Sequence, residues 1–152
     1  MRNVRIMEFR DIVSMTNKER PMGHLTPIEG EQDIPFEIKR MYYLTRVPEN
    51  TTRGFHAHKK LEQILICMNG KVTISVSTPY DKQLITLDDP AKGLYIGPMI
   101  WREMYDFSPG SVLTVLASEH YMSQITFEII KSIVNWHKTI LQSSEDKNES
   151  TV

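Results

Sequence analysis

Short apolar segments separated by turn residues follow one another along most of the chain. The clearest alternation runs over residues 71–77, where Val72, Ile74 and Val76 share one face, because successive side chains of a strand point to opposite faces. Residues 36–47 are rich in aromatic and β-branched types and form the strongest strand expected before His56 and His58. Further strands are predicted at residues 4–9, 63–68, 83–87, 94–96, 100–106 and 111–117, with a short edge strand at 24–28.

Two regions depart from this pattern. Residues 11–23 are polar and carry Pro21 and Gly23, so they are predicted to form a loop or a short irregular helix. Isoleucines at helical spacing predict a helix over residues 126–141, and the polar residues 143–152 are expected to form a disordered tail. The many short strands with turn residues between them predict one all-β domain over residues 1–142, a sandwich or a barrel carrying a C-terminal helix.

Composition adds few exclusions to this picture. The chain has 152 residues, of which 40% are hydrophobic and 24% charged, as in ordinary globular proteins. Its net charge of −1 and the lack of a dominant basic patch argue against a nucleic-acid partner. No apolar run approaches the roughly 20 residues of a membrane-spanning helix. Cys67 is the single cysteine and has no intrachain partner, so the reducing cytoplasm is the expected compartment.

The residues with the most chemical potential are His56 and His58. In an extended chain residues i and i+2 point to the same face, roughly 6–7 Å apart at a rise of about 3.3 Å per residue. Two imidazoles side by side can ligate a metal, or they can move protons near neutral pH. A third possibility is that both are ordinary side chains with satisfied hydrogen bonds.

His56, His58 and the following Glu62 resemble the first metal-binding motif of the cupin superfamily, whose fold is a jelly-roll β-barrel. A mononuclear cupin site also needs a histidine from a later strand, and Arg102 stands near where that histidine would fall. Arginine has no acceptor lone pair, so it is not a metal ligand. We therefore expect no metal and no other cofactor, and keep a metal-dependent cupin enzyme as an alternative.

Several separate motifs, occurring in order from about Gly23 to Tyr121, resemble those of the nucleotide-sugar 3,4-ketoisomerases. They are Ile34-Pro35-Phe36-Glu37-Ile38-Lys39-Arg40-Met41-Tyr42-Tyr43, Arg53-Gly54-Phe55-His56-Ala57-His58-Lys59-Lys60-Leu61-Glu62-Gln63, Gly93-Leu94-Tyr95-Ile96-Gly97-Pro98, Glu103-Met104, Asp106-Phe107-Ser108 and Leu116-Ala117-Ser118-Glu119.

The resemblance implies a metal-independent cupin that forms a homodimer with strands exchanged between subunits. Such an enzyme converts a dTDP-4-keto-6-deoxyhexose into its 3-keto isomer, which is later aminated to a 3-amino-3,6-dideoxy sugar for surface polysaccharide. A non-catalytic dTDP-sugar-binding cupin is the remaining alternative.

The resemblance also implies roles for individual residues. His56 and His58 match the catalytic histidines, with His56 expected to take the carbon-bound proton and His58 the oxygen proton, although the opposite assignment stays open. Tyr42 and Arg46 match a tyrosine and an arginine beside the sugar, and the neighbouring register, Tyr43 or Arg40, also stays open.

Four further residues have candidate roles, each set against a plain structural one. Arg53 is a candidate to pair with the diphosphate through its planar fork, or it merely caps its loop. Trp101 is a candidate to stack on the base or the sugar, or it packs in the core. Arg102 replaces the histidine of the family's Trp-His-Glu-Met motif, which bears on substrate choice or rate. Glu62 is expected to set a histidine tautomer or to face solvent.

Overall fold

The computed structural model describes residues 1–16 and 20–121, and within them every regular element is a β-strand. The helix predicted over residues 126–141 and the tail predicted over residues 143–152 lie outside this part of the chain. In order, the strands are β1 (Val4–Glu8), β2 (Ile12–Thr16), β3 (Arg20–Leu25), β4 (Arg40–Leu44), β5 (Arg53–His56), β6 (Gln63–Asn69), β7 (Val72–Ser77), β8 (Lys82–Leu87), β9 (Lys92–Ile96), β10 (Trp101–Tyr105) and β11 (Val112–Ala117).

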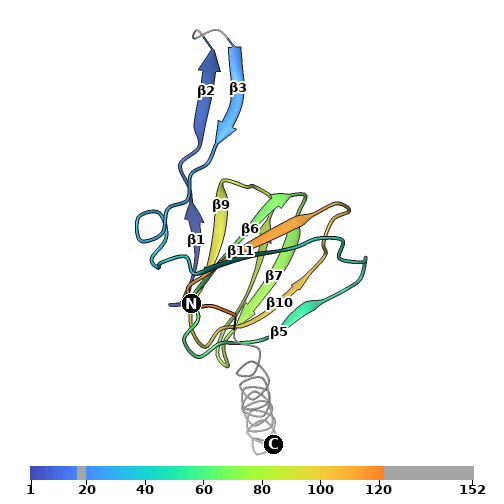
Figure 1. Ribbon diagram of the computed structural model, residues 1–152. Coiled ribbons are helices and arrows are strands. Elements are labelled where there is room, and N and C mark those ends of the chain that lie inside the picture. The colour runs from blue at the N-terminus through green and yellow to red at the C-terminus, as the bar shows by residue number, and fades with distance from the viewer. Residues whose placement is uncertain (17–19, 122–152) are drawn as a thin grey trace, which may run out of the picture.

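Two antiparallel sheets face each other and enclose the main core (Figure 1). The larger sheet has the order β1-β9-β6-β11-β4, and the smaller has the order β5-β10-β7-β8. Inward side chains from both sheets, such as Leu65, Ile74, Leu94 and Leu113, form one buried cluster between them. The all-β prediction is therefore confirmed, and the alternation read from residues 71–77 describes β7 correctly.

The central strand β6 is buried on both faces. Leu65 and Cys67 point into the main core, whereas Ile64 and Ile66 point to the outer face of the sheet. A second apolar cluster covers that outer face, and its members include Ile34 and Phe36 of the segment before β4. Burial on both faces explains why residues 64–67, after Gln63, form an unbroken apolar run.

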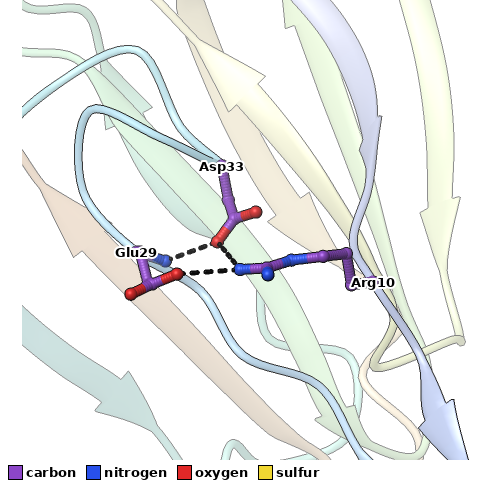
Figure 2. Close-up of polar contacts among 3 residues, drawn as sticks. All are labelled: Arg10, Glu29 and Asp33. Carbon is purple, nitrogen blue, oxygen red and sulfur yellow. Dashed lines mark hydrogen bonds and ion pairs between the residues drawn. The ribbon is translucent and has the colours of Figure 1, made fainter.

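A small ion-pair cluster fastens this covering segment to the chain just after β1 (Figure 2). One Arg10 nitrogen, Nη2, lies 2.8 Å from Glu29 Oε2 and 3.0 Å from Asp33 Oδ2. The backbone N–H of Glu29 donates to the same Asp33 oxygen at 2.8 Å and, together with Arg10, lowers the pKa of Asp33. Exposed pairs of this kind contribute little stability, so the apolar cluster beneath them provides most of the attachment.

Residues 11–23 were expected to be a loop or a short irregular helix, and this prediction is wrong. They contribute to a hairpin, β2–β3, that stands away from the barrel (Figure 1). The hairpin tolerates Pro21 and Gly23 because both of its strands are edge strands, so the outer edge of β3 forms no further ladder hydrogen bonds. Its register also shifts between Ser14 and Met15. The predicted edge strand at residues 24–28 is reduced to the end of β3.

The strand expected over residues 36–47 is also shorter than predicted. Only Arg40–Leu44 pairs with β11, with Tyr42 opposite Val115. The residues before β4 belong to the outer apolar cluster. After β4, Arg46 has a positive φ of 54°, which ends the extended conformation.

Candidate active site

The two histidines lie beside each other at the end of β5. His56 is the last residue of the strand and pairs with Arg102 of β10. The ring centroids of His56 and His58 are 4.7 Å apart, with an angle of 69° between the rings. The predicted pairing of the two side chains is therefore confirmed. However, they do not share one regular strand, because His58 lies past the end of β5, and the rings are closer than the extended spacing would place them.

The backbone before His56 follows a path that requires glycine. Gly54 has a φ of +100°, and a Cβ at this position would lie 2.6 Å from the carbonyl oxygen of Arg102. A side chain therefore fits here neither sterically nor conformationally. The adjacent Phe55 also has a positive φ, 57°, and its side chain is about half exposed. This local turn brings β5 against β10 and places His56 next to Arg102.

The same turn determines which nitrogen of His56 carries the proton. His56 Nδ1 lies 2.9 Å from the carbonyl oxygen of Gly54. A carbonyl oxygen only accepts hydrogen bonds, so Nδ1 is the N–H donor and, in the neutral ring, Nε2 keeps its lone pair. Burial and the positive charge of Arg102 lower the pKa of His56. At neutral pH this imidazole is thus a neutral base with one defined accepting atom.

His58 is held neutral more strongly than its neighbour. Burial lowers its pKa to about 3, with further contributions from the charges of Arg102, His56 and Arg40. Protonation would place a second positive charge next to a buried guanidinium, which is unfavourable in a poorly solvated interior. Both imidazoles are therefore uncharged around neutral pH, the state in which they can accept protons.

Arg102 is the buried cation that faces this pair. Its side chain is only 1% exposed, and its Nη1 donates to Gln63 Oε1 at 2.6 Å. Burial lowers the pKa of Arg102 to about 10, so the guanidinium remains charged at neutral pH. Its Nε and Nη2 have no hydrogen-bond partner among the residues that the structure describes. A buried donor without a partner costs about 1–3 kcal/mol, and more when it is charged, which is typical of a group that meets its partner in a ligand.

Gln63 connects Arg102 to Tyr42 across the interior. Its Oε1 accepts from Arg102 on β10, and its Nε2 donates to the Tyr42 hydroxyl oxygen on β4 at 2.8 Å. Burial raises the pKa of Tyr42, although the positive charges of Arg102 and Arg40 act to lower it. Sequence reasoning missed Gln63, and its signal was a single amide at the start of an otherwise apolar strand.

The structure separates the two registers left open around Tyr42. Tyr42 is half-buried and bonded to Gln63, whereas Tyr43 is 62% exposed on the other face of β4. Arg40 shares the inner face with Tyr42, and its guanidinium lies 5.2 Å from the centroid of that ring. Arg46 lies beyond the end of the strand at Leu44 and is exposed.

The remaining candidates lie at the margins of the site. Arg53 is exposed at the start of β5. Trp101 is half-buried at the start of β10, and its indole Nε1 donates to Glu103 Oε1 at 2.8 Å. Glu62 was expected to set a histidine tautomer or to face solvent, but its Oε1 accepts from the Tyr95 hydroxyl at 2.6 Å. Burial and this carboxylate raise the pKa of Tyr95 to about 12.

Residues 1–16 and 20–121 contain no group of three or more His, Cys, Asp or Glu side chains placed to hold a metal ion. Nor does this part of the chain contain a helix long and apolar enough to cross a membrane.

Solved structures with the same architecture define the class of protein. A variant of the 3,4-ketoisomerase QdtA from Thermoanaerobacterium thermosaccharolyticum, in complex with TDP-4-keto-6-deoxyglucose, superposes with a TM-score of 0.75 and 53% identity, covering 81% of this chain and 85% of that one. A 3,4-ketoisomerase from Helicobacter canadensis superposes with a TM-score of 0.76 and 36% identity, covering 88% and 98%. A cupin-type barrel of the sugar-nucleotide ketoisomerase class is thus confirmed.

The family follows from the sequence comparisons. The family model described as "FdtA: WxcM-like, C-terminal" matches residues 2–131. The curated TDP-4-oxo-6-deoxy-alpha-D-glucose-3,4-oxoisomerase from Aneurinibacillus thermoaerophilus is 41% identical over 143 residues, which are 94% of this chain and 96% of the relative. The chain belongs to this FdtA family, as its motifs predicted.

The lowered pKa values of the histidine pair predict how stability depends on pH. The unfolded chain, with histidine pKa values near 6.5, binds these protons more readily than the folded chain does. The free energy of unfolding is therefore highest above about pH 6.5. It falls as the pH falls from there toward the pKa in the folded chain, which is about 3 for His58. Urea unfolding between pH 7.5 and 5 should show a falling free energy of unfolding, and His58→Asn should reduce the slope. His120→Asn is the matched control because it replaces an exposed histidine. Equal slopes in the wild type and His58→Asn would contradict the burial of a neutral His58.

Proposed function

We propose that the protein converts a dTDP-4-keto-6-deoxyhexose into the dTDP-3-keto-6-deoxyhexose, with His56 and His58 as its catalytic residues. The observation that carries the proposal is the contact of two neutral imidazoles beside a buried arginine that has unused donors. Relatives of the chain include an oxoisomerase of TDP-4-oxo-6-deoxyglucose and a ketoisomerase of the same fold whose structure holds TDP-4-keto-6-deoxyglucose.

The first step removes a proton from carbon. His56 Nε2 takes the proton from C3 of the sugar, the C3–H electron pair forms the C3=C4 double bond, and the C4 carbonyl becomes an enolate oxygen. The Nδ1–H of His56 keeps its bond to the Gly54 carbonyl oxygen, which supports the imidazolium as it forms. General base catalysis of this kind contributes about 10²–10⁴-fold.

The second step moves a proton between the two oxygens. His58 accepts the proton of the C3 hydroxyl and passes a proton to the C4 oxygen, so the ring ends neutral. A low pKa suits this relay because the imidazole does not retain the proton. The imidazolium of His56, whose Nε2 proton exchanges with solvent, then delivers a proton to C4, the C3 carbonyl forms, and both histidines regain their starting state.

Arg102 stabilises the negative charge that develops on the enediolate. Its Nε and Nη2 are charged donors already held in a buried position, which makes them effective at an oxyanion without reorganisation. Arg40, on the inner face of β4 beside Tyr42, replaces Arg46 as the arginine next to the sugar.

The nucleotide end of the substrate is assigned to the exposed margin of the site. Arg53 is proposed to pair with the diphosphate and Trp101 to stack on the base or the sugar, consistent with their exposed and half-buried positions. The 3-keto product is the substrate that an amination at C3 requires, in a route to a 3-amino-3,6-dideoxy sugar of surface polysaccharide. The proposed compartment is the cytoplasm, where an unpaired Cys67 is ordinary.

We also propose a homodimer with exchanged strands. The β2–β3 hairpin stands away from its own barrel and makes no sheet with it (Figure 1). It exposes large apolar side chains that a second copy of the chain would cover, namely Ile12, Val13, Met22 and Leu25. Exposed apolar surface of this kind commonly marks an interface.

The proposed reaction predicts exchange of a carbon-bound hydrogen with solvent. Incubation with dTDP-4-keto-6-deoxyglucose in deuterated water should give a 3-keto product carrying deuterium at C4, detected by NMR, and a chelator should not stop the reaction. His56→Asn should lower the rate by about 10²–10⁴-fold. His120→Asn, which replaces an exposed histidine, should retain the wild-type rate.

Each other outcome identifies a different error. Turnover that ends with the chelator would point to a metal-dependent cupin enzyme. Binding of the sugar nucleotide without exchange by the wild type would point to a non-catalytic binding protein. Full activity of His56→Asn would remove that histidine from the mechanism.

The dimer predicts a molar mass in solution of twice that of one chain, 17.7 kDa, by light scattering coupled to size exclusion. Replacing two exposed hairpin residues, Val13→Glu with Met22→Glu, should shift the mass toward the monomer because two charges cannot be buried unpaired. A matched change on a strand of the smaller sheet, Leu84→Glu, is the control, since Leu84 is 63% exposed. A monomeric wild type would contradict this proposal.

A further inference from the structure

The buried arginine fixes the direction of a hydrogen-bond chain that ends at Tyr42. A guanidinium donates hydrogen bonds and never accepts them. Arg102 Nη1 lies 2.6 Å from Gln63, so the side-chain atom of Gln63 that faces it must be the carbonyl oxygen. The amide nitrogen of Gln63 therefore points the other way, toward the Tyr42 hydroxyl at 2.8 Å.

This orientation leaves Tyr42 with one role in the bond. Because Gln63 Nε2 donates, the hydroxyl oxygen of Tyr42 must accept, and its hydrogen is directed elsewhere. In the described part of the chain this hydroxyl hydrogen has no acceptor. The three residues come from three strands of the two sheets, β10, β6 and β4, so the chain spans the interior of the barrel.

We propose that Gln63 is a positioning residue that makes Tyr42 a hydrogen-bond donor to a reacting oxygen of the sugar. The inference rests on the proposed function, because the oxygen in question is that of the keto group or of the enediolate formed from it. Tyr42 then acts from β4 while Arg102 acts from β10, and one amide holds both. Burial raises the pKa of Tyr42, so the hydroxyl keeps its hydrogen at the working pH.

A purely structural role for Gln63 makes a different forecast. If Gln63 only tied the two sheets together, Gln63→Glu would be the mild variant, since a carboxylate keeps a bond to both neighbours. Gln63→Met would be the severe variant, since methionine loses both bonds. The directional chain predicts that Gln63→Glu is the severe variant and Gln63→Met the mild one. A carboxylate accepts a hydrogen bond from the Tyr42 hydroxyl, which then cannot donate to the sugar, whereas methionine leaves that hydroxyl free to donate.

The experiment measures kcat and KM for conversion of dTDP-4-keto-6-deoxyglucose by each variant of the full chain. Gln63→Glu should lower kcat by about 10²-fold and change KM much less, because the lost bond strengthens in the transition state. Gln63→Met should lower kcat less than Gln63→Glu does. Gln83→Glu on β8, which makes the same chemical change outside the chain, should keep the wild-type kcat.

The Tyr42→Phe background separates this effect from the electrostatic effect of a new carboxylate beside Arg102. If Gln63→Glu acts through the hydroxyl of Tyr42, it should cost at least about tenfold less in Tyr42→Phe than in the wild type, since coupled residues are not additive. Equal costs in the two backgrounds would overturn the inference, as would no cost at all or a greater loss in Gln63→Met than in Gln63→Glu.

Gln63→Met still tests the inference if Gln63→Glu does not fold. Its loss of kcat should then be smaller than that of Tyr42→Phe, and an equal or greater loss would overturn the inference. Failure of the wild type to turn over the sugar nucleotide would instead contradict the proposed function, so the two failures are distinguishable.

Discussion

The central constraint in this protein is the burial of one guanidinium charge between two β-sheets. Arg102 is almost completely enclosed, and a single neutral oxygen, from Gln63, compensates it directly. A charge in such an interior acts strongly on its neighbours because little solvent screens it. It helps to keep the adjacent imidazoles of His56 and His58 unprotonated, and it orients the amide that reaches Tyr42.

The barrel supplies the precision that this arrangement needs. Gly54 lets β5 approach β10 closely and presents a carbonyl oxygen that fixes the tautomer of His56. Gln63 sits on the central strand, which apolar clusters bury on both faces. Groups held in this way need no rearrangement when charge develops on a substrate, and preorganisation of this kind is the main source of electrostatic catalysis. One fold therefore positions both the imidazole pair and the cation.

Much of this could be predicted from the sequence, and the failures have physical causes. Short apolar segments between turn residues identified most strands of the barrel, and the His56–His58 spacing identified two imidazoles that lie together. Gln63 escaped notice because its importance depends on a partner in the opposite sheet, which no local pattern reveals. The strand expected over residues 36–47 was drawn too long because β4 ends at Leu44 and Arg46 has a positive φ, which no local pattern reveals. The hairpin of residues 12–25 was missed because proline and glycine normally interrupt strands, yet a two-stranded hairpin accommodates them.

The central claim is that two neutral imidazoles lie beside a buried positive charge, and a histidine ¹⁵N NMR titration tests it most directly. The account predicts that at pH 5.5 His58 gives the signals of a neutral ring, that His56 protonates below its ordinary pKa and carries its proton on Nδ1 while neutral, and that Arg102→Met raises both pKa values. Protonation of either ring near the ordinary value of about 6.5, unaffected by Arg102→Met, would contradict it.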